Sequence, residues 1–91
     1  MKLERLLKQL YELLDKHGID TWAVRIKQVR DRLGNCSDDS VVEDLKKFFQ
    51  GAGTLDDLVI LQSNGHRIEK KEEKKVNKYL EYLIQEIKNC F

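Results

Sequence analysis

A chain of 91 residues has room for one hydrophobic core, so we expect a single domain spanning residues 1–91. Its 17 basic and 16 acidic residues leave a net charge of +1, which argues against a dedicated nucleic-acid binder, because such proteins carry a clear basic excess. With 2 cysteines, no signal-peptide pattern at the N-terminus and no apolar run long enough for a membrane span, the sequence predicts a cytoplasmic protein with free thiols.

Three amphipathic helices are predicted for the first half of the chain, over about residues 2–17, 20–33 and 38–50. Each shows apolar residues at three- and four-residue steps with charged residues between them. Because the intervening loops are short, the three helices should pack as antiparallel neighbours. The first stripe is the most regular and consists of Leu3, Leu6, Leu7, Leu10, Leu13 and Leu14.

Glycines and small polar residues mark the expected ends of these helices. Gly18, Gly34 and Gly51 each follow a predicted helix and can take the left-handed conformation that commonly ends one. Ser40 begins a capping-box pattern for the third helix, and Ser37 is an equally suitable N-cap.

The periodicity changes after the third helix. The run over residues 58–61 is short, apolar and β-prone, and Asn64-Gly65 is the preferred centre of a tight hairpin. The sequence therefore predicts a β-hairpin over about residues 57–68, followed by a last helix over about residues 69–90. The expected fold class is mainly α (α+β): a small bundle of about four helices with one β-hairpin inserted before the last helix.

The turn over residues 51–57 has two interpretations. Two glycines two residues apart could direct backbone N–H groups at an anion, but no lysine follows at the spacing of a phosphate-binding loop, and a helix rather than a strand precedes it. One interpretation is a structural turn in which Asp56 or Asp57 bonds local backbone groups. The other is an exposed recognition loop, since loops held by rigid elements often carry function.

This segment also resembles a known signature. From Gly51 to Leu61 it reads Gly-Ala-Gly-Thr-Leu-Asp-Asp-Leu-Val-Ile-Leu, which is similar to the motif Gly-Gly-Met-Gly-Ser-Leu-Asn-Asp-Leu-Val-Leu of a family of small bacterial proteins of unknown function. The chain departs from that motif at Gln50, Ala52 and Asp56, where the family has Gly, Met and Asn. The resemblance implies the same order of elements and a bacterial, cytosolic origin, and it implies no activity.

Residues with catalytic or metal-binding chemistry are few and scattered. The conceivable nucleophilic pairs join Cys36 or Cys90 to His17 or His66, and free cysteines are more often small buried hydrophobes than nucleophiles. The same residues lie too far apart in sequence for a zinc-site spacing. We therefore expect no enzyme, no catalytic residues, no metal and no cofactor.

Binding to another protein is the function left by this elimination. The middle of the chain, residues 36–67, is its acidic part, and acidic surfaces steer basic partners. One concrete version is an immunity protein that neutralises a toxin with a basic surface by covering the toxin's active site. The residues expected to meet that partner are Thr54, Asp56, Asp57, Glu43 and Asp44.

Two further features bear on partners. One member of each aromatic pair, Phe48-Phe49 and Tyr79/Tyr82, should point away from the core and could anchor an interface. The alternative function is a small nucleic-acid-associated regulator that uses the basic second helix, and a homo-oligomer is compatible with a self-complementary apolar face. The cations of that helix are Arg25, Lys27, Arg30 and Arg32.

Overall fold

The computed structural model describes residues 2–35, 39–49, 55 and 58–90. These residues form four α-helices and two short 3₁₀ helices. In chain order the elements are α1 (Lys2–Lys16), α2 (Asp20–Asn35), α3 (Asp39–Lys47), η2 (Gln62–Asn64), η3 (Lys70–Glu72) and α4 (Glu73–Lys88).

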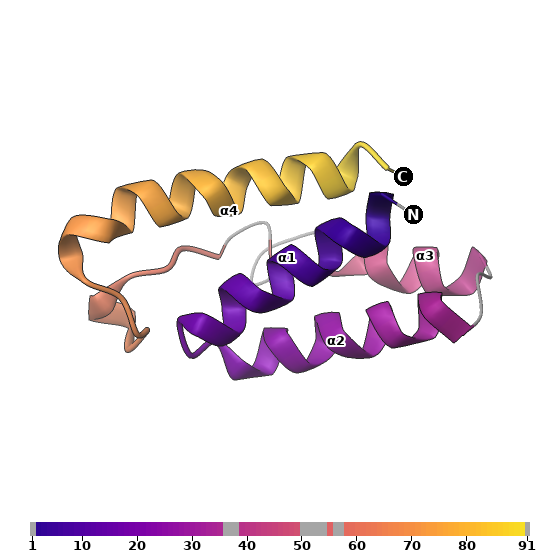
Figure 1. Cartoon of the computed structure of the whole chain (residues 1–91), viewed down its shortest axis with the longest axis horizontal. Helices are drawn as coiled ribbons and strands as arrows, with labels where there is room; N and C mark the ends of the chain where they lie inside the picture. The colour runs from indigo at the N-terminus through magenta and orange to yellow at the C-terminus, as the bar shows by residue number, and fades with distance from the viewer. Residues whose placement is uncertain (1, 36–38, 50–54, 56–57, 91) are drawn as a thin grey trace.

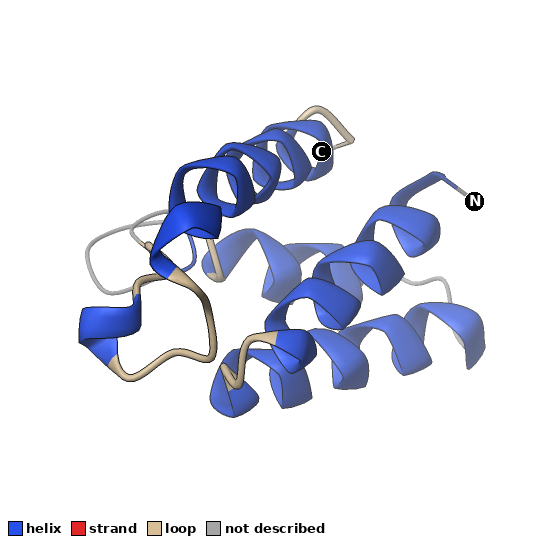
Figure 2. Cartoon of the chain, turned by 60° about the vertical axis from the view of Figure 1, so that its left-hand side comes forward, coloured by secondary structure: helices blue, strands red, loops and turns tan. Residues whose placement is uncertain are grey.

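The α1 helix is the centre of the arrangement. It packs along α2 on one side and against α4 on the other, while α3 packs on α2 (Figure 1). The segment between α3 and α4 returns past the end of α1 before α4 begins, as Figure 2 shows from another side. The molecule is elongated, with extents of 40 × 22 × 20 Å. No helix in the described ranges is long and apolar enough to cross a membrane.

The regular leucine stripe explains the central place of α1. Its apolar positions are so closely spaced that the helix can bury side chains against two neighbours at once. Leu7, Leu10 and Leu14 are completely buried, and burying one such side chain contributes about 1.5–3 kcal/mol. The other helices and the segment before α4 complete one core, with fully buried side chains at Ile26, Leu45, Leu55, Ile60, Leu80, Leu83 and Ile87.

The stop predicted at Gly18 is confirmed. Its φ is +74°, and two bonds of a Schellman motif surround it, from the Gly18 N–H to the Asp15 carbonyl (3.2 Å) and from the Ile19 N–H to the Leu14 carbonyl (2.9 Å). The prediction at Gly34 is wrong, because α2 continues through that glycine without a left-handed residue. A glycine inside a helix costs only about 1 kcal/mol, which the packing of the last turn of α2 offsets.

The third helix is shorter than predicted. It ends at Lys47, and Phe48 and Phe49 follow in a tighter turn whose N–H groups bond to the carbonyls of Leu45 (3.0 Å) and Lys46 (3.1 Å). This turn buries Phe49, and Phe48 is half-buried and packs against the core. The prediction that one of the two points away from the core is therefore not met. The expected cap at Ser37 and stop at Gly51 lie outside the described residues.

The predicted hairpin is wrong: the described residues contain no β-strand. The run at residues 58–61, which we call the extended run, has no helix or strand and reaches an extended backbone at Leu61 (φ −134°, ψ 142°). Within it Val59 is exposed and Ile60 is completely buried. Its hydrogen-bonding partner is a side chain of α4. The side-chain Oδ1 of Asn77 accepts the Ile60 N–H (2.7 Å). The side-chain Nδ2 of Asn77 donates to the backbone carbonyls of Ile60 (2.9 Å) and Glu73 (2.7 Å).

The turn after this run has a different geometry from the one predicted. A type I′ hairpin needs a positive φ at both central residues, but Gly65 has one (φ 83°) and Asn64 does not. Instead η2 ends in a Schellman motif, with bonds from the Gly65 N–H to the Gln62 carbonyl (3.0 Å) and from the His66 N–H to the Leu61 carbonyl (3.3 Å). The His66 Nδ1 also accepts the Leu61 N–H (3.1 Å).

The segment predicted as the return strand bonds to the end of α1. The Arg67 N–H donates to the His17 carbonyl (2.9 Å), and the Nδ1–H of the buried His17 ring donates to the Arg67 carbonyl (2.6 Å). Because both β-prone runs find partners on helices, they do not pair with each other. The described fold is therefore all-helical, with α4 beginning only after η3.

Candidate functional site

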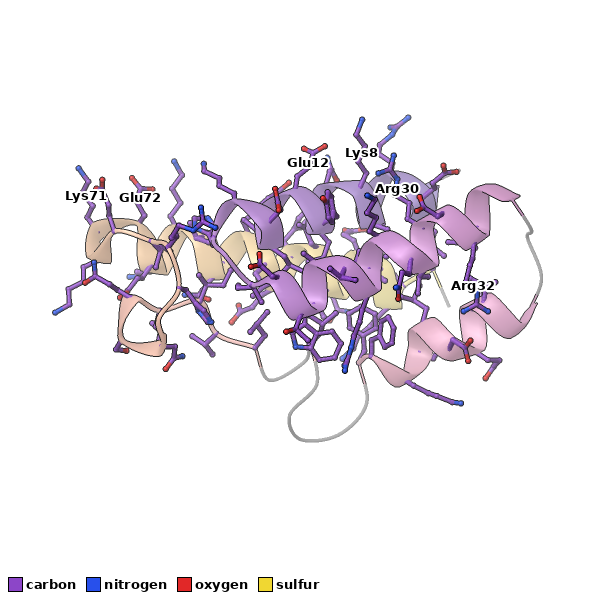
Figure 3. All side chains as sticks on the ribbon, turned by 90° about the horizontal axis from the view of Figure 1, so that it is seen from below. Lys8, Glu12, Arg30, Arg32, Lys71 and Glu72 are labelled. Atoms are coloured by element: carbon purple, nitrogen blue, oxygen red, sulfur yellow. The ribbon has the colours of Figure 1, made fainter. Side chains whose placement is uncertain are left out.

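The acidic residues expected to meet a partner are only partly within the described structure. Thr54, Asp56 and Asp57 lie outside the described residues. Glu43 and Asp44 lie on α3, and each pairs with a cation of the same chain. The Glu43 carboxylate bonds to Lys46 (3.1 Å) and the Asp44 carboxylate to Arg32 of α2 (3.0 Å). Figure 3 shows Arg32 between α2 and α3.

Leu55 of the 51–61 motif has a structural role. The Leu55 side chain is completely buried, and its N–H donates to the Phe48 carbonyl (2.9 Å). The Leu58 N–H donates in turn to the Leu55 carbonyl (3.2 Å). This leucine therefore anchors the chain between α3 and the extended run to the core.

The basic face of α2 is also partly engaged. The Arg25 guanidinium lies 4.9 Å from the centre of the Trp22 ring, and Trp22 packs edge-on against Phe48 with ring centres 5.6 Å apart. Arg32 pairs with Asp44. Two of the four cations expected to meet nucleic acid thus have partners inside the chain.

The scattered cysteine and histidine residues form no described catalytic pair. Cys90 is half-buried and its thiol donates to the Glu86 carbonyl (3.4 Å), while Cys36 lies outside the described residues. The His17 and His66 rings each use Nδ1 in a bond to the backbone. Among the described residues, no group of three or more His, Cys, Asp or Glu side chains is placed to hold a metal ion.

An exposed aromatic pair stands out on α4. Tyr79 is 41% exposed and Tyr82 is 55% exposed, and their rings stack with centres 6.3 Å apart and planes 16° from parallel. The expectation that one of the two would join the core is wrong. At 100° per residue, both tyrosines fall outside the sector occupied by the buried Leu80, Leu83 and Ile87. A stricter use of the helical period would have found this.

A groove runs beside this pair, between α1 and α4. It has a volume of about 450 Å³, and Leu13, Val76 and Tyr79 supply its apolar lining. Lysines precede each tyrosine by one turn, at Lys75 and Lys78, and both are exposed. We call the surface formed by Lys75, Lys78, Tyr79 and Tyr82 the tyrosine face, and it is the candidate site that the described structure supports best.

Comparison with known proteins gives a family and no activity. The model of DUF6966, a domain of unknown function, matches residues 15–69, which include α2, α3 and the extended run and end before α4. No curated protein and no solved structure matches the chain. Because the family model covers more than half of its length, the chain belongs to the DUF6966 family.

Proposed function

We propose that this chain is a small protein-binding module. The observation that carries the proposal is the stacked, exposed Tyr79–Tyr82 pair beside the α1/α4 groove. A tyrosine presents a large, rigid, amphipathic surface with little rotamer entropy to lose, and buried tyrosines are common hot spots of protein interfaces. The resemblance of the 51–61 segment to small bacterial proteins and the free cysteine support a bacterial, cytoplasmic setting.

The tyrosine pair lies outside the buried core of α4. Tyr79 and Tyr82 stack on each other at the edge of the α1/α4 groove, and the buried residues of the helix are Leu80, Leu83, Ile84 and Ile87. Two aromatic side chains left side by side in water forgo the gain of burial, about 25 cal/mol for each Å² of apolar surface. A partner that covers them recovers this free energy.

The test compares the original chain, a double variant and a single control variant in their affinity for one captured partner. Cross-linking in cells of the source organism and mass spectrometry identify the partner, and its affinity for the purified chain is then measured by calorimetry. Replacing both tyrosines, Tyr79→Ser with Tyr82→Ser, should weaken binding by about 30-fold or more, since a hot spot contributes at least about 2 kcal/mol. The matched control is Val24→Ser, which removes an exposed apolar side chain (53%) from α2 and should leave binding unchanged. Equal affinity of all three proteins would refute the proposal.

An immunity protein is one specific form of this function. In that form Asp56 and Asp57, with Thr54, Glu43 and Asp44, face a toxin that has a basic surface. The two acids of α3 would have to exchange their present partners for cations of the toxin, which lowers the gain from each contact. Charge reversal at Asp56→Lys with Asp57→Lys should slow association with such a toxin while the chain stays folded, and an unchanged association rate would dispose of this form.

A nucleic-acid-associated regulator is the alternative, and the engaged arginines of α2 give it no specific support. Binding to nucleic acid that falls steeply with salt would favour it over protein binding. Analytical ultracentrifugation of the purified chain tests separately whether it forms a homo-oligomer.

A further inference from the structure

We infer that the tyrosine face binds an acidic peptide segment of its partner, with an apolar residue of that segment against Tyr79 and Tyr82 and carboxylates on Lys75 and Lys78. The inference rests on the proposed function and adds the chemistry of the partner. The expected charge of the partner is thereby reversed, because in the sequence the acidic middle of the chain pointed to a basic partner.

The positions of the lysines on α4 are the first step. Lys75 and Lys78 each precede a tyrosine by four residues, and residues four apart on a helix are neighbours on one face. All four side chains are exposed. The face therefore offers two aromatic rings with an ammonium group at the N-terminal side of each.

The lysines of the face have no partner within the described structure. Three other cations of the chain form ion pairs: Arg32 with Asp44, Lys46 with Glu43, and Lys71 with Glu69 (3.3 Å). Neither Lys75 nor Lys78 makes an ion pair or hydrogen bond with any described residue. Their charges are thus available to a partner.

Two of the three carboxylates of α4 are already engaged. Glu73 accepts the Gln62 N–H (2.8 Å), and the half-buried Glu86 has an interaction in the chain. Glu81 is exposed and lies three residues after Lys78, so it is a neighbour of that lysine on the helix surface. Against the two lysines, α4 therefore sets one exposed carboxylate without a partner among the described residues.

The neighbouring groove sets where each part of the segment lies. Its apolar lining, Leu13, Val76 and Tyr79, suits an aliphatic or aromatic side chain of the partner. Its charged lining is balanced, with Glu12 and Glu72 against Lys16 and Lys75, and Figure 3 shows the two glutamates projecting from the same side of the molecule. The groove itself therefore does not favour a carboxylate, and the acidic residues of the segment bind at its edge, on Lys75 and on the exposed Lys78.

Other anionic partners fit this face less well. A phosphate backbone carries a charge at every nucleotide and binds through a continuous basic surface, whereas here Glu12, Glu72 and Glu81 flank the lysines. A helix that lies in a membrane surface buries its apolar stripe in lipid, but the stripe of α4 is already packed in the core. A short protein segment needs only the few contacts that the face provides.

The test pans a random peptide library displayed on phage against the folded, immobilised chain. We expect enriched peptides that combine acidic residues with an aliphatic or aromatic residue. Their synthetic forms should bind at least about tenfold more weakly to the variant Lys75→Glu with Lys78→Glu, with a flatter dependence on ionic strength. The control variant Lys27→Glu, which reverses an exposed cation of α2, should bind as the original chain does, and circular dichroism confirms that all variants are folded.

The outcomes separate this inference from the proposed function. One such outcome is a set of peptides that lose binding to Tyr79→Ser with Tyr82→Ser and still bind the lysine variant as tightly as the original chain, and another is the enrichment of basic peptides. Either result would refute binding of an acidic segment and would still support a protein-binding role for the tyrosine face. Peptides indifferent to both variants, or no enrichment at all, would overturn both. Binding of fluorescent single-stranded DNA or of phosphatidylserine vesicles that depends on Lys75 and Lys78 in place of peptide binding would also overturn the inference.

Discussion

The amide of Asn77 should be among the most important polar groups for stability. It makes three hydrogen bonds of 2.7–2.9 Å to backbone atoms, two of them to Ile60 of the extended run. Each such bond contributes about 0.5–1.5 kcal/mol net, so Asn77→Ala should cost about 2–4 kcal/mol. A domain of this size has a total stability of about 5–14 kcal/mol, and the melting temperature should therefore fall by about 10–20 °C.

Urea unfolding followed by circular dichroism at equilibrium measures this loss. The matched control is Asn64→Ala, because the Asn64 amide makes a single long bond to the Val59 carbonyl (3.4 Å) at the surface and should cost less than about 0.5 kcal/mol. Hydrogen exchange adds a local readout: the Ile60 amide should be protected in the original chain and exchange rapidly in Asn77→Ala. If Asn77→Ala and Asn64→Ala lose the same stability and the Ile60 amide stays protected in Asn77→Ala, the Asn77 side chain does not hold residues 58–61 in place.

Two further pairs of substitutions test the helix end and the motif leucine. Gly18→Ala should destabilise the chain by about 1–2 kcal/mol, because φ is +74° and the new Cβ would lie 3.1 Å from the Arg67 Nε. Gly34→Ala, inside α2, should instead stabilise the chain by about 0.4–1 kcal/mol, because the new Cβ would meet the end of the Glu4 side chain at an ordinary contact distance of 3.9 Å. Thermal melts that show the same sign for both variants would contradict this account. Leu55→Ala should cost about 2–5 kcal/mol of stability, because the Leu55 side chain is completely buried. Leu58→Ala should cost clearly less, because the Leu58 side chain is half-buried. Equal urea midpoints of the two variants would count against an anchoring role for Leu55.

Much of the helical part of the fold could be predicted from the sequence. The leucine stripe of α1 and the glycine at position 18 act through neighbours within one or two turns, so periodicity and local backbone preference are sufficient to predict them. The same reasoning placed α2, α3 and α4 within a few residues of their ends. It failed at Gly34, where tertiary packing of the last turn outweighs a weak local preference.

The candidate site could be predicted only in part. The sequence pointed to a protein partner and to one member of each aromatic pair, Phe48-Phe49 and Tyr79/Tyr82, as an interface anchor, but it placed the binding residues in the acidic middle of the chain. The pairing of Glu43 with Lys46 and of Asp44 with Arg32 depends in part on how α3 packs on α2, which composition does not reveal. The exposure of both tyrosines is consistent with the helical period of α4, whereas the groove beside them depends on where α4 meets α1.

The hairpin shows most clearly where sequence reasoning reaches its limit. The runs around Ile60 and Arg67 have the composition of strands, and because their backbones lie outside the helices they need other hydrogen-bonding partners. Which groups supply those partners depends on distant parts of the chain: Asn77 on α4 bonds to Ile60, and His17 at the end of α1 bonds to Arg67. The sequence by itself determined that these segments leave the helical pattern, because that follows from local composition. Only the tertiary structure decided that helices, rather than each other, satisfy their backbones, because hydrogen bonds between residues 17 and 50 positions apart form only once α1 and α4 are packed.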